Sequence, residues 1–223
     1  WLLIGVGGVM ALTRRLGASR GWALAAGLLF ALHPAVFEPT CLVMARSDVV
    51  ATSAMIWALL GFHRFVQGDG RRWLVLHVLA VAIALGSKET AVVLLPALVI
   101  WVFCLGEPPR RRAFLAIVPT LVLVVLYLIG RRAVLGSGHL ALQLEPLRLF
   151  VGSARYLRGL VPLQLLPPSE NLPDVVARSS GEILAALVTW LVVLALAGLA
   201  LRTRRLALVA VAAWGLGALA PVL

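Results

Sequence analysis

The chain has 223 residues, of which 62% are hydrophobic and 13% are charged, and its mean hydropathy is +1.03. A soluble domain carries about 25% charged residues. The net charge of +11 comes from short arginine clusters, without the basic stripe and interleaved aromatics of a nucleic-acid groove. The composition excludes a soluble domain, gives no support for a nucleic-acid partner and indicates an integral membrane protein in a lipid bilayer.

Continuous runs rich in Leu, Ala and Val predict an all-α fold, a polytopic transmembrane helix bundle, rather than alternating strands. About eight such runs follow one another, at residues 1–13, 21–37, 49–66, 73–87, 89–105, 113–130, 182–201 and 206–223. We expect residues 1–223 to form a single transmembrane domain. Both ends of the chain look cut, so we expect the sequence to be a fragment of a longer protein.

The connectors between the runs alternate in charge. Twelve of the twenty Lys and Arg residues lie in four connectors, at 14–20, 63–72, 106–112 and 202–205. The short opposite connectors hold only Arg46 and Lys88. Because cytoplasmic loops are enriched in Lys and Arg, we expect the four arginine-rich loops to face the cytoplasm, in a bacterial inner membrane.

The acidic residues are skewed toward the opposite, outer face. Of the nine acidic residues, seven fall there under this topology: Glu38, Asp48, Glu89, Glu145, Glu170, Asp174 and Glu182. Residues 131–181 form the one long connector, and five prolines prevent it from being a single span. We expect this extracytoplasmic loop to contain short interfacial helices. An outer face rich in carboxylates is where we expect chemistry.

The first candidate segment begins at His33-Pro34 and continues to Glu38-Pro39. A residue before proline is pushed out of the helical region, so the second apolar run should end at His33. Glu38 is either a solvated loop residue or an acid–base carboxylate at the boundary between water and lipid. In the second case His33 would be a hydrogen-bond donor lining the same pocket.

The second candidate segment is Arg46-Ser47-Asp48, at the start of the next helix. Ser47 and Asp48 are good capping and first-turn residues, because they accept hydrogen bonds from free backbone amides. Asp48 is also a candidate catalytic carboxylate. The guanidinium of Arg46 beside a helix N-terminus suits an anion such as phosphate.

The third candidate segment, Ser87-Lys88-Glu89-Thr90, joins two short apolar runs. It is either a capping sequence or a bend that places Lys88 and Glu89 in a cavity. Arg131-Arg132 breaks the charge rule on the outer face, so it either reaches lipid headgroups or binds a phosphate-bearing ligand. His139 adds to the positive charge of the outer loop.

Several other residues have structural interpretations. We expect His77 to pack against neighbouring helices, and the glycines of 5–8 to allow close helix packing. Cys41 and Cys104 should lie toward opposite faces and not pair. The sequence contains no metal-ligand spacing, phosphate-binding glycine loop or nucleophile elbow. No cofactor is predicted, and a need for a divalent metal stays open.

Together the three segments resemble a known family. Leu32-His33-Pro34 with Glu38, Ala45-Arg46-Ser47-Asp48, and Ser87-Lys88-Glu89-Thr90 before Leu95-Pro96 are similar to the membrane part of the transmembrane and tetratricopeptide-repeat proteins. These are relatives of the protein O-mannosyltransferases, among the multi-spanning glycosyltransferases of the C type. The resemblance covers residues 20–105.

The resemblance implies transfer of a sugar from a polyprenyl-phosphate donor to a protein or glycan acceptor at the outer face. It assigns Arg46, Lys88, Arg131 and Arg132 to the donor phosphate, and Glu38 and Asp48 to orientation or acid–base chemistry. Such enzymes place their catalytic acid in the first outer loop, so the resemblance implies that this fragment lacks the first span and that loop. It also implies a tetratricopeptide-repeat region C-terminal to the fragment.

A transporter or flippase for a lipid-linked or anionic substrate is the alternative. In that protein class Lys88, Glu89 and His33 would line a translocation path. Transporters tend to have internal repeats and charged groups near the bilayer midplane. Here the ionisable residues gather at one face and the two halves of the chain do not resemble each other, which favours an outer-face enzyme.

Overall fold

The computed structural model of the chain describes residues 1–33, 36, 40–41, 45–104, 110–135, 181, 183–185 and 187–191. The chain divides into two compact units, Trp1–Val134 and Leu135–Leu223. Regular structure in the described ranges is entirely helical, as the sequence predicts. In the second unit the described residues within 181–191 are helical. The prediction of one transmembrane domain over the whole chain stays a prediction.

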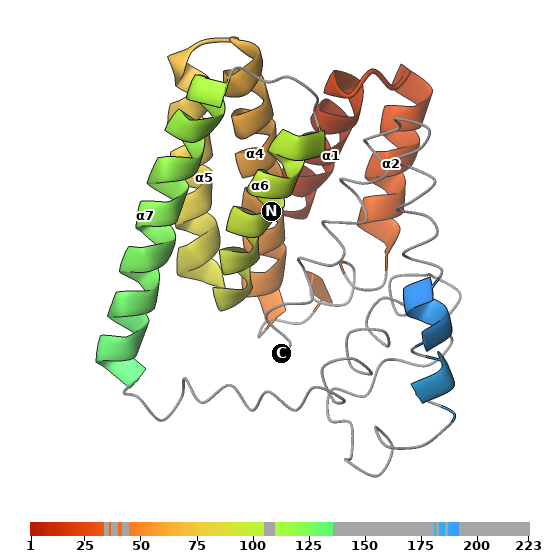
Figure 1. Ribbon diagram of the computed structural model, residues 1–223. Helices are drawn as coiled ribbons and strands as arrows, with labels where there is room; N and C mark the ends of the chain where they lie inside the picture. The colour runs from red at the N-terminus through yellow and green to blue at the C-terminus, as the bar shows by residue number, and fades with distance from the viewer. Residues whose placement is uncertain are drawn as a thin grey trace. The chain divides into compact units, whose positions relative to one another are not determined.

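The first unit consists of six α-helices and one 3-10 helix within its described residues (Figure 1). In chain order these are α1 (Leu2–Arg15), α2 (Arg20–Leu32), α4 (Arg46–Gln67), α5 (Arg71–Ser87), η2 (Glu89–Val93), α6 (Leu94–Cys104) and α7 (Arg110–Leu135). They follow the first six predicted runs. His33 is the C-cap of α2, with extended backbone, as expected for a residue before proline.

Helix α4 lies at the centre of the first unit and packs against α1 on one side and α5 on another. Glycines of α1 allow the first of these contacts. A Cβ added at Gly5 would lie 2.7 Å from Ser53 Oγ, and one at Gly8 would lie 2.8 Å from Ile56 Cγ2. Gly7 faces open space. The predicted role of this glycine run in close packing is therefore confirmed for Gly5 and Gly8.

The contact between α4 and α5 is equally close. A Cβ at Gly61 would lie 2.9 Å from the carbonyl oxygen of Trp73 and 3.0 Å from the amide nitrogen of His77. Both of these atoms belong to the backbone of α5, which cannot move aside as a flexible side chain can. Only glycine allows the two helix backbones to approach this closely.

Helix α7 touches the rest of the first unit along a narrow stripe. Its buried residues, Ala113, Ala116, Thr120 and Val124, recur every three or four positions and so share one face. Thr120 Oγ1 lies 2.8 Å from Nε2 of His77, whose Nδ1 lies 2.8 Å from the carbonyl oxygen of Ala58. His77 therefore joins α5 to both α4 and α7. This confirms the prediction that it packs between helices.

Two helices in the described part of the chain are long and apolar enough to cross a membrane, Arg46–Gln67 and Arg111–Val134. The expected number of about eight spans is therefore not confirmed. Helices α1, α2, α5 and α6 have 14, 13, 17 and 11 residues. At 1.5 Å per residue, a 13-residue helix is about 20 Å long, well short of a roughly 30 Å core. Most of the last two predicted spans lies outside the described residues.

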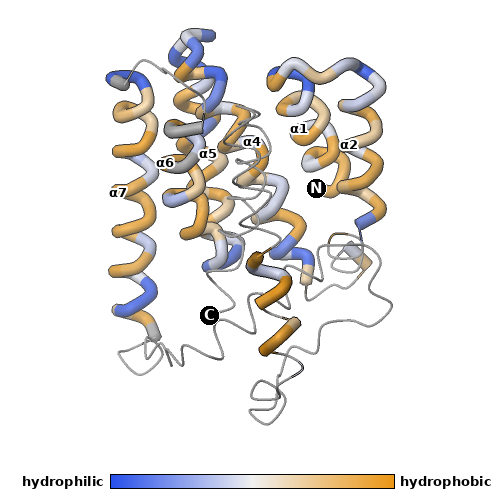
Figure 2. Tube along the Cα trace, turned by 45° about the vertical axis from the view of Figure 1, so that its right-hand side comes forward, coloured by the Kyte–Doolittle hydropathy of each residue, from blue (hydrophilic) through white to orange (hydrophobic). Residues whose placement is uncertain are grey.

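Hydrophilic residues gather at the two ends of the first unit, with apolar helix between them (Figure 2). One end contains the α1–α2 turn, the α4–α5 turn and the start of α7, and we call it the arginine-rich end (Figure 1). The other contains the start of α4, the α5–η2 junction and the end of α7, and we call it the ion-pair end. The predicted separation of two charged faces is thus present in the first unit.

Candidate functional site

The ion-pair end contains a salt bridge between two of the predicted segments. Asp48 lies in the first turn of α4, and its Oδ1 atom pairs with Nζ of Lys88, the residue that follows α5. The two positions are forty residues apart in sequence, and the packing of α4 against α5 brings them together. Asp48 also complements the positive end of the α4 dipole, as predicted.

A second salt bridge lies at the same end. Glu89 Oε2 is 3.7 Å from Nη1 of Arg131, near the end of α7. The same Arg131 nitrogen donates a hydrogen bond to the Tyr127 hydroxyl over 3.3 Å. These contacts hold one guanidinium between a carboxylate and a phenol.

Lys88 and Glu89 do not form a pair with each other, although they are neighbours. Lys88 has an extended backbone, with φ −156° and ψ 141°, whereas Glu89 begins η2. Successive side chains of extended backbone point in opposite directions, so the two charges diverge toward different helices. Sequence proximity had suggested a single Lys–Glu unit. Instead, each residue ties the α5–η2 junction to another element.

Both salt bridges are only partly shielded from water. The side chains of Lys88 and Asp48 are 34% and 31% exposed, although the paired Oδ1 atom of Asp48 is itself buried. Arg131 is 29% exposed and Glu89 is 52% exposed. Ion pairs at this depth contribute little to stability, about 0–1 kcal/mol each. They do, however, hold two cations at defined positions that a ligand from outside can reach.

The remaining predicted site residues are placed as follows. Arg46 is exposed at the start of α4, and Arg132 is exposed beside Arg131. His33 is half-buried at the end of α2. Glu38 and His139 lie outside the described residues.

The first-turn role predicted for Asp48 is confirmed, but the structure shows no side-chain capping by Ser47 or by Ser87. The N-cap of α4 is Ala45, which makes no side-chain capping bond, and Ser47 is exposed inside the first turn. The hydroxyl of Ser87 donates to the carbonyl oxygen of Ile83 over 2.7 Å, so it bonds backward within α5. The start of η2 likewise has no side-chain cap.

Tyr127, which contacts Arg131, is a residue of this end that the sequence analysis did not identify. Its spacing of four residues from Arg131 was the available signal, because residues i and i+4 of a helix are neighbours. Within the described ranges, no group of three or more His, Cys, Asp and Glu residues could hold a metal ion.

The arrangement leaves an excess of positive charge. The described residues of this end include the cations Arg46, Lys88, Arg131 and Arg132 against the carboxylates Asp48 and Glu89. Amine and guanidinium groups held in place by carboxylates can bind phosphate oxygens through charge-assisted hydrogen bonds. This end of the first unit can therefore take up an anion such as a phosphate ester.

Sequence comparison finds curated relatives of part of this chain. The chain is 37% identical over 90 residues to Protein O-mannosyl-transferase Tmtc2 and 36% identical over 86 residues to Protein O-mannosyl-transferase Tmtc1, both of Drosophila melanogaster. Each match covers 38% of this chain, but it spans only 10% of the length of the relative. No solved structure matches the chain.

The family match covers the whole first unit and confirms the resemblance. Residues 1–135 match the family described as Dolichyl-phosphate-mannose-protein mannosyltransferase. This region contains α1 to α7 and both salt bridges of the ion-pair end. Because it is more than half of the 223 residues, the chain belongs to the dolichyl-phosphate-mannose-protein mannosyltransferase family.

Proposed function

We propose that the protein containing this chain is a membrane glycosyltransferase that moves mannose from a polyprenyl-phosphate donor to a protein or glycan acceptor. The observation that carries the proposal is the pair of salt bridges at one end of the matched family region, Asp48–Lys88 and Glu89–Arg131. They hold two cations at the level where an apolar helix bundle meets water. A donor with a lipid tail and a phosphate headgroup needs both of these environments.

The reaction transfers a glycosyl group. The acceptor hydroxyl loses its proton to a carboxylate base, and its oxygen bonds to the anomeric carbon of mannose. The bond between that carbon and the phosphate oxygen breaks, and its electron pair leaves with the polyprenyl phosphate. Negative charge grows on the departing phosphate, so cations fixed in advance beside it stabilise the transition state.

We assign the phosphate to Lys88 and Arg131, with Arg46 and Arg132 as additional cations at its edge. Asp48 and Glu89 are positioning residues, because each is committed to one of the two central cations. We assign Glu38 to orientation of the donor or acceptor, because the resemblance places the catalytic carboxylate in the first outer loop.

The orientation is also part of the proposal. The arginine-rich end faces the cytoplasm and the ion-pair end faces the opposite side, in accordance with the distribution of Lys and Arg. Transfer then occurs at the extracytoplasmic face. A bacterial inner membrane and a C-terminal tetratricopeptide-repeat region stay predictions of the sequence.

The direct test is transfer from polyprenyl-phosphate mannose by the full-length protein that contains this chain. Lys88→Ala should lower the rate about a hundredfold, the effect typical of removing one electrostatic stabiliser. Lys88→Arg should restore part of the rate because it keeps the charge. Glu38→Gln should lower the rate by about tenfold or more, as expected for loss of a charged hydrogen bond that orients a substrate.

Arg71→Gln, an exposed residue at the opposite end, is the matched control and should leave transfer unchanged. Expression and membrane insertion should be the same for all variants. Wild-type transfer by both Lys88→Ala and Glu38→Gln would refute the site assignment. Absence of transfer by the wild-type protein with this donor would refute the proposed function itself.

A further inference from the structure

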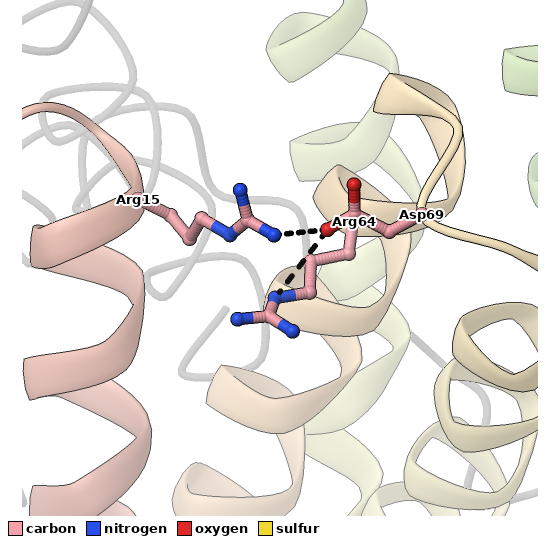
Figure 3. Close-up of polar contacts among 3 residues, drawn as sticks. All are labelled: Arg15, Arg64 and Asp69. Carbon is pink, nitrogen blue, oxygen red and sulfur yellow. Dashed lines mark hydrogen bonds and ion pairs between the residues drawn. The ribbon is translucent and has the colours of Figure 1, made fainter.

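The arginine-rich end contains a second charged site that the sugar-transfer proposal does not use. Asp69 lies in the turn between α4 and α5, and its Oδ2 atom is shared by two arginines (Figure 3). Arg15, from the last turn of α1, pairs directly with this oxygen. Arg64, from the last turn of α4, places its Nε 3.8 Å away. One carboxylate thus bridges two helix ends.

Two more guanidinium groups lie close to neighbours of Asp69, one beside the Trp73 ring and one beside Gly68. The indole ring of Trp73 lies beneath Arg64, whose Cζ is 4.1 Å from the ring centroid, and Cζ of Arg72 is 5.8 Å from the same centroid. The guanidinium of Arg112, in the first turn of α7, lies against Gly68, with Nη1 in the place that a side chain at Gly68 would occupy. We call Arg15, Arg64, Arg72, Arg112 and Asp69 the arginine cluster. It has four positive groups for one negative group.

Several buried polar atoms at and near the cluster make no hydrogen bond, although Arg64 Nε is in ion-pair range of Asp69. Arg64 Nε and Trp73 Nε1 are buried and make no hydrogen bond, and the same holds for His63 Nδ1 and Trp101 Nε1. The His63 and Trp101 rings are each 6% exposed and lie edge to face, 6.2 Å apart. Buried N–H donors without acceptors are costly, so the unused hydrogen-bonding capacity at the cluster favours an anionic ligand.

The surface adjoining the cluster is apolar. Val75 and Leu79 of α5 are largely exposed, as are Phe114 and Leu115 in the early turns of α7. These residues follow Arg72 and Arg112 directly along their helices. A free phosphate would gain nothing from such a surface, whereas the acyl chains of a lipid would cover it. The combination suits a molecule with an anionic headgroup and a hydrocarbon tail.

We propose that the arginine cluster binds the headgroup phosphate of an anionic membrane phospholipid. The phosphate oxygens accept hydrogen bonds from the guanidinium groups of Arg64, Arg72 and Arg112, while Asp69 keeps Arg15 and Arg64 in place. Basic sites between transmembrane helices are known binding places for anionic headgroups. The proposal does not depend on the sugar-transfer function.

The test is native mass spectrometry of the detergent-solubilised full chain, titrated with phosphatidylglycerol and separately with phosphatidylcholine. We expect saturable binding of phosphatidylglycerol alone. Arg64→Gln should weaken it about tenfold, the loss of one hydrogen bond to a charged group. Arg112→Gln, which leaves the Asp69 ion pairs intact, should weaken it by a similar factor. This second variant keeps the test valid if Arg64→Gln fails to fold.

Arg14→Gln is the matched control, because Arg14 lies beside Arg15 but donates only to the carbonyl oxygen of Ala18 in its own turn. It should change the affinity by less than about twofold, since it contacts no group of the cluster. Equal weakening by Arg14→Gln and Arg112→Gln would overturn the proposal in favour of diffuse surface charge. Equal binding of phosphatidylcholine, or displacement of phosphatidylglycerol by equimolar inorganic phosphate, would also overturn it.

Discussion

At the scale of single residues, the packing of α4 on α5 depends on the absence of a side chain at Gly61. Gly61→Ala should destabilise the protein by about 1–3 kcal/mol, because the added methyl meets rigid backbone of α5. Gly130→Ala, on α7 with open space around it, should be neutral or stabilising by up to about 1 kcal/mol. Thermal unfolding in detergent measures both. Equal melting temperatures for the two variants would contradict the close contact.

The adjacent residues Arg131 and Arg132 provide a second comparison. Arg131 is held by Glu89 and Tyr127, whereas Arg132 is exposed. An arginine fixed in advance loses less freedom when it binds a ligand. Arg131→Gln should therefore raise the KM for the polyprenyl-phosphate donor about tenfold, and Arg132→Gln by about threefold or less. A larger effect of Arg132→Gln would show that the ion pair with Glu89 withholds Arg131 from the donor.

The sequence predicted which residues of the candidate site lie at one end of the bundle, but not their partners. Charge counting separates the two ends, because it depends only on composition between apolar runs. The partner of Lys88 depends on the rotation of α4 against α5, which is set by contacts such as that at Gly61. The divergence of Lys88 and Glu89 depends on one extended residue at a helix boundary. Neither feature leaves a periodic signal.

At the scale of helices, His77 joins α5 to α7 through Thr120. A double-mutant cycle with His77→Leu and Thr120→Val isolates this bond from the loss of packing. We expect a coupling of about 1 kcal/mol, within the range for hydrogen bonds between membrane helices. The double variant should lower the unfolding temperature by less than the sum of the decreases in the two single variants. Additive effects of the two substitutions would contradict a direct bond.

Helix boundaries were more predictable than membrane spans. Proline after His33 and the charged segment at Arg46 mark the end of α2 and the start of α4, because they restrict or stabilise local backbone. Hydropathy alone could not separate full spans from short apolar helices. Helix α2 is as apolar as a span, yet only 13 residues are helical. Length is set by where the chain turns, which hydropathy does not record.

At the scale of the whole molecule, the two charged ends of the first unit should lie on opposite sides of the membrane. Cys41 is free and exposed close to the start of α4, and Gln67 is exposed at the other end of that helix. In a Cys104→Ser background, an impermeant thiol reagent added to intact cells should label Cys41. In the same Cys104→Ser background, a Cys41→Ser, Gln67→Cys variant should react with the reagent only after the membrane is opened. Labelling of both positions in intact cells would contradict a membrane-crossing α4.

The central claim is that the ion-pair end binds the phosphate of the lipid-linked donor. The most direct measurement is the dissociation constant of polyprenyl phosphate for the detergent-solubilised full chain and for its Lys88→Ala and Arg71→Gln variants. We expect Lys88→Ala to raise this constant about tenfold, because a charged hydrogen bond is lost, and Arg71→Gln to leave it unchanged. The same constant for wild type and Lys88→Ala would contradict the claim.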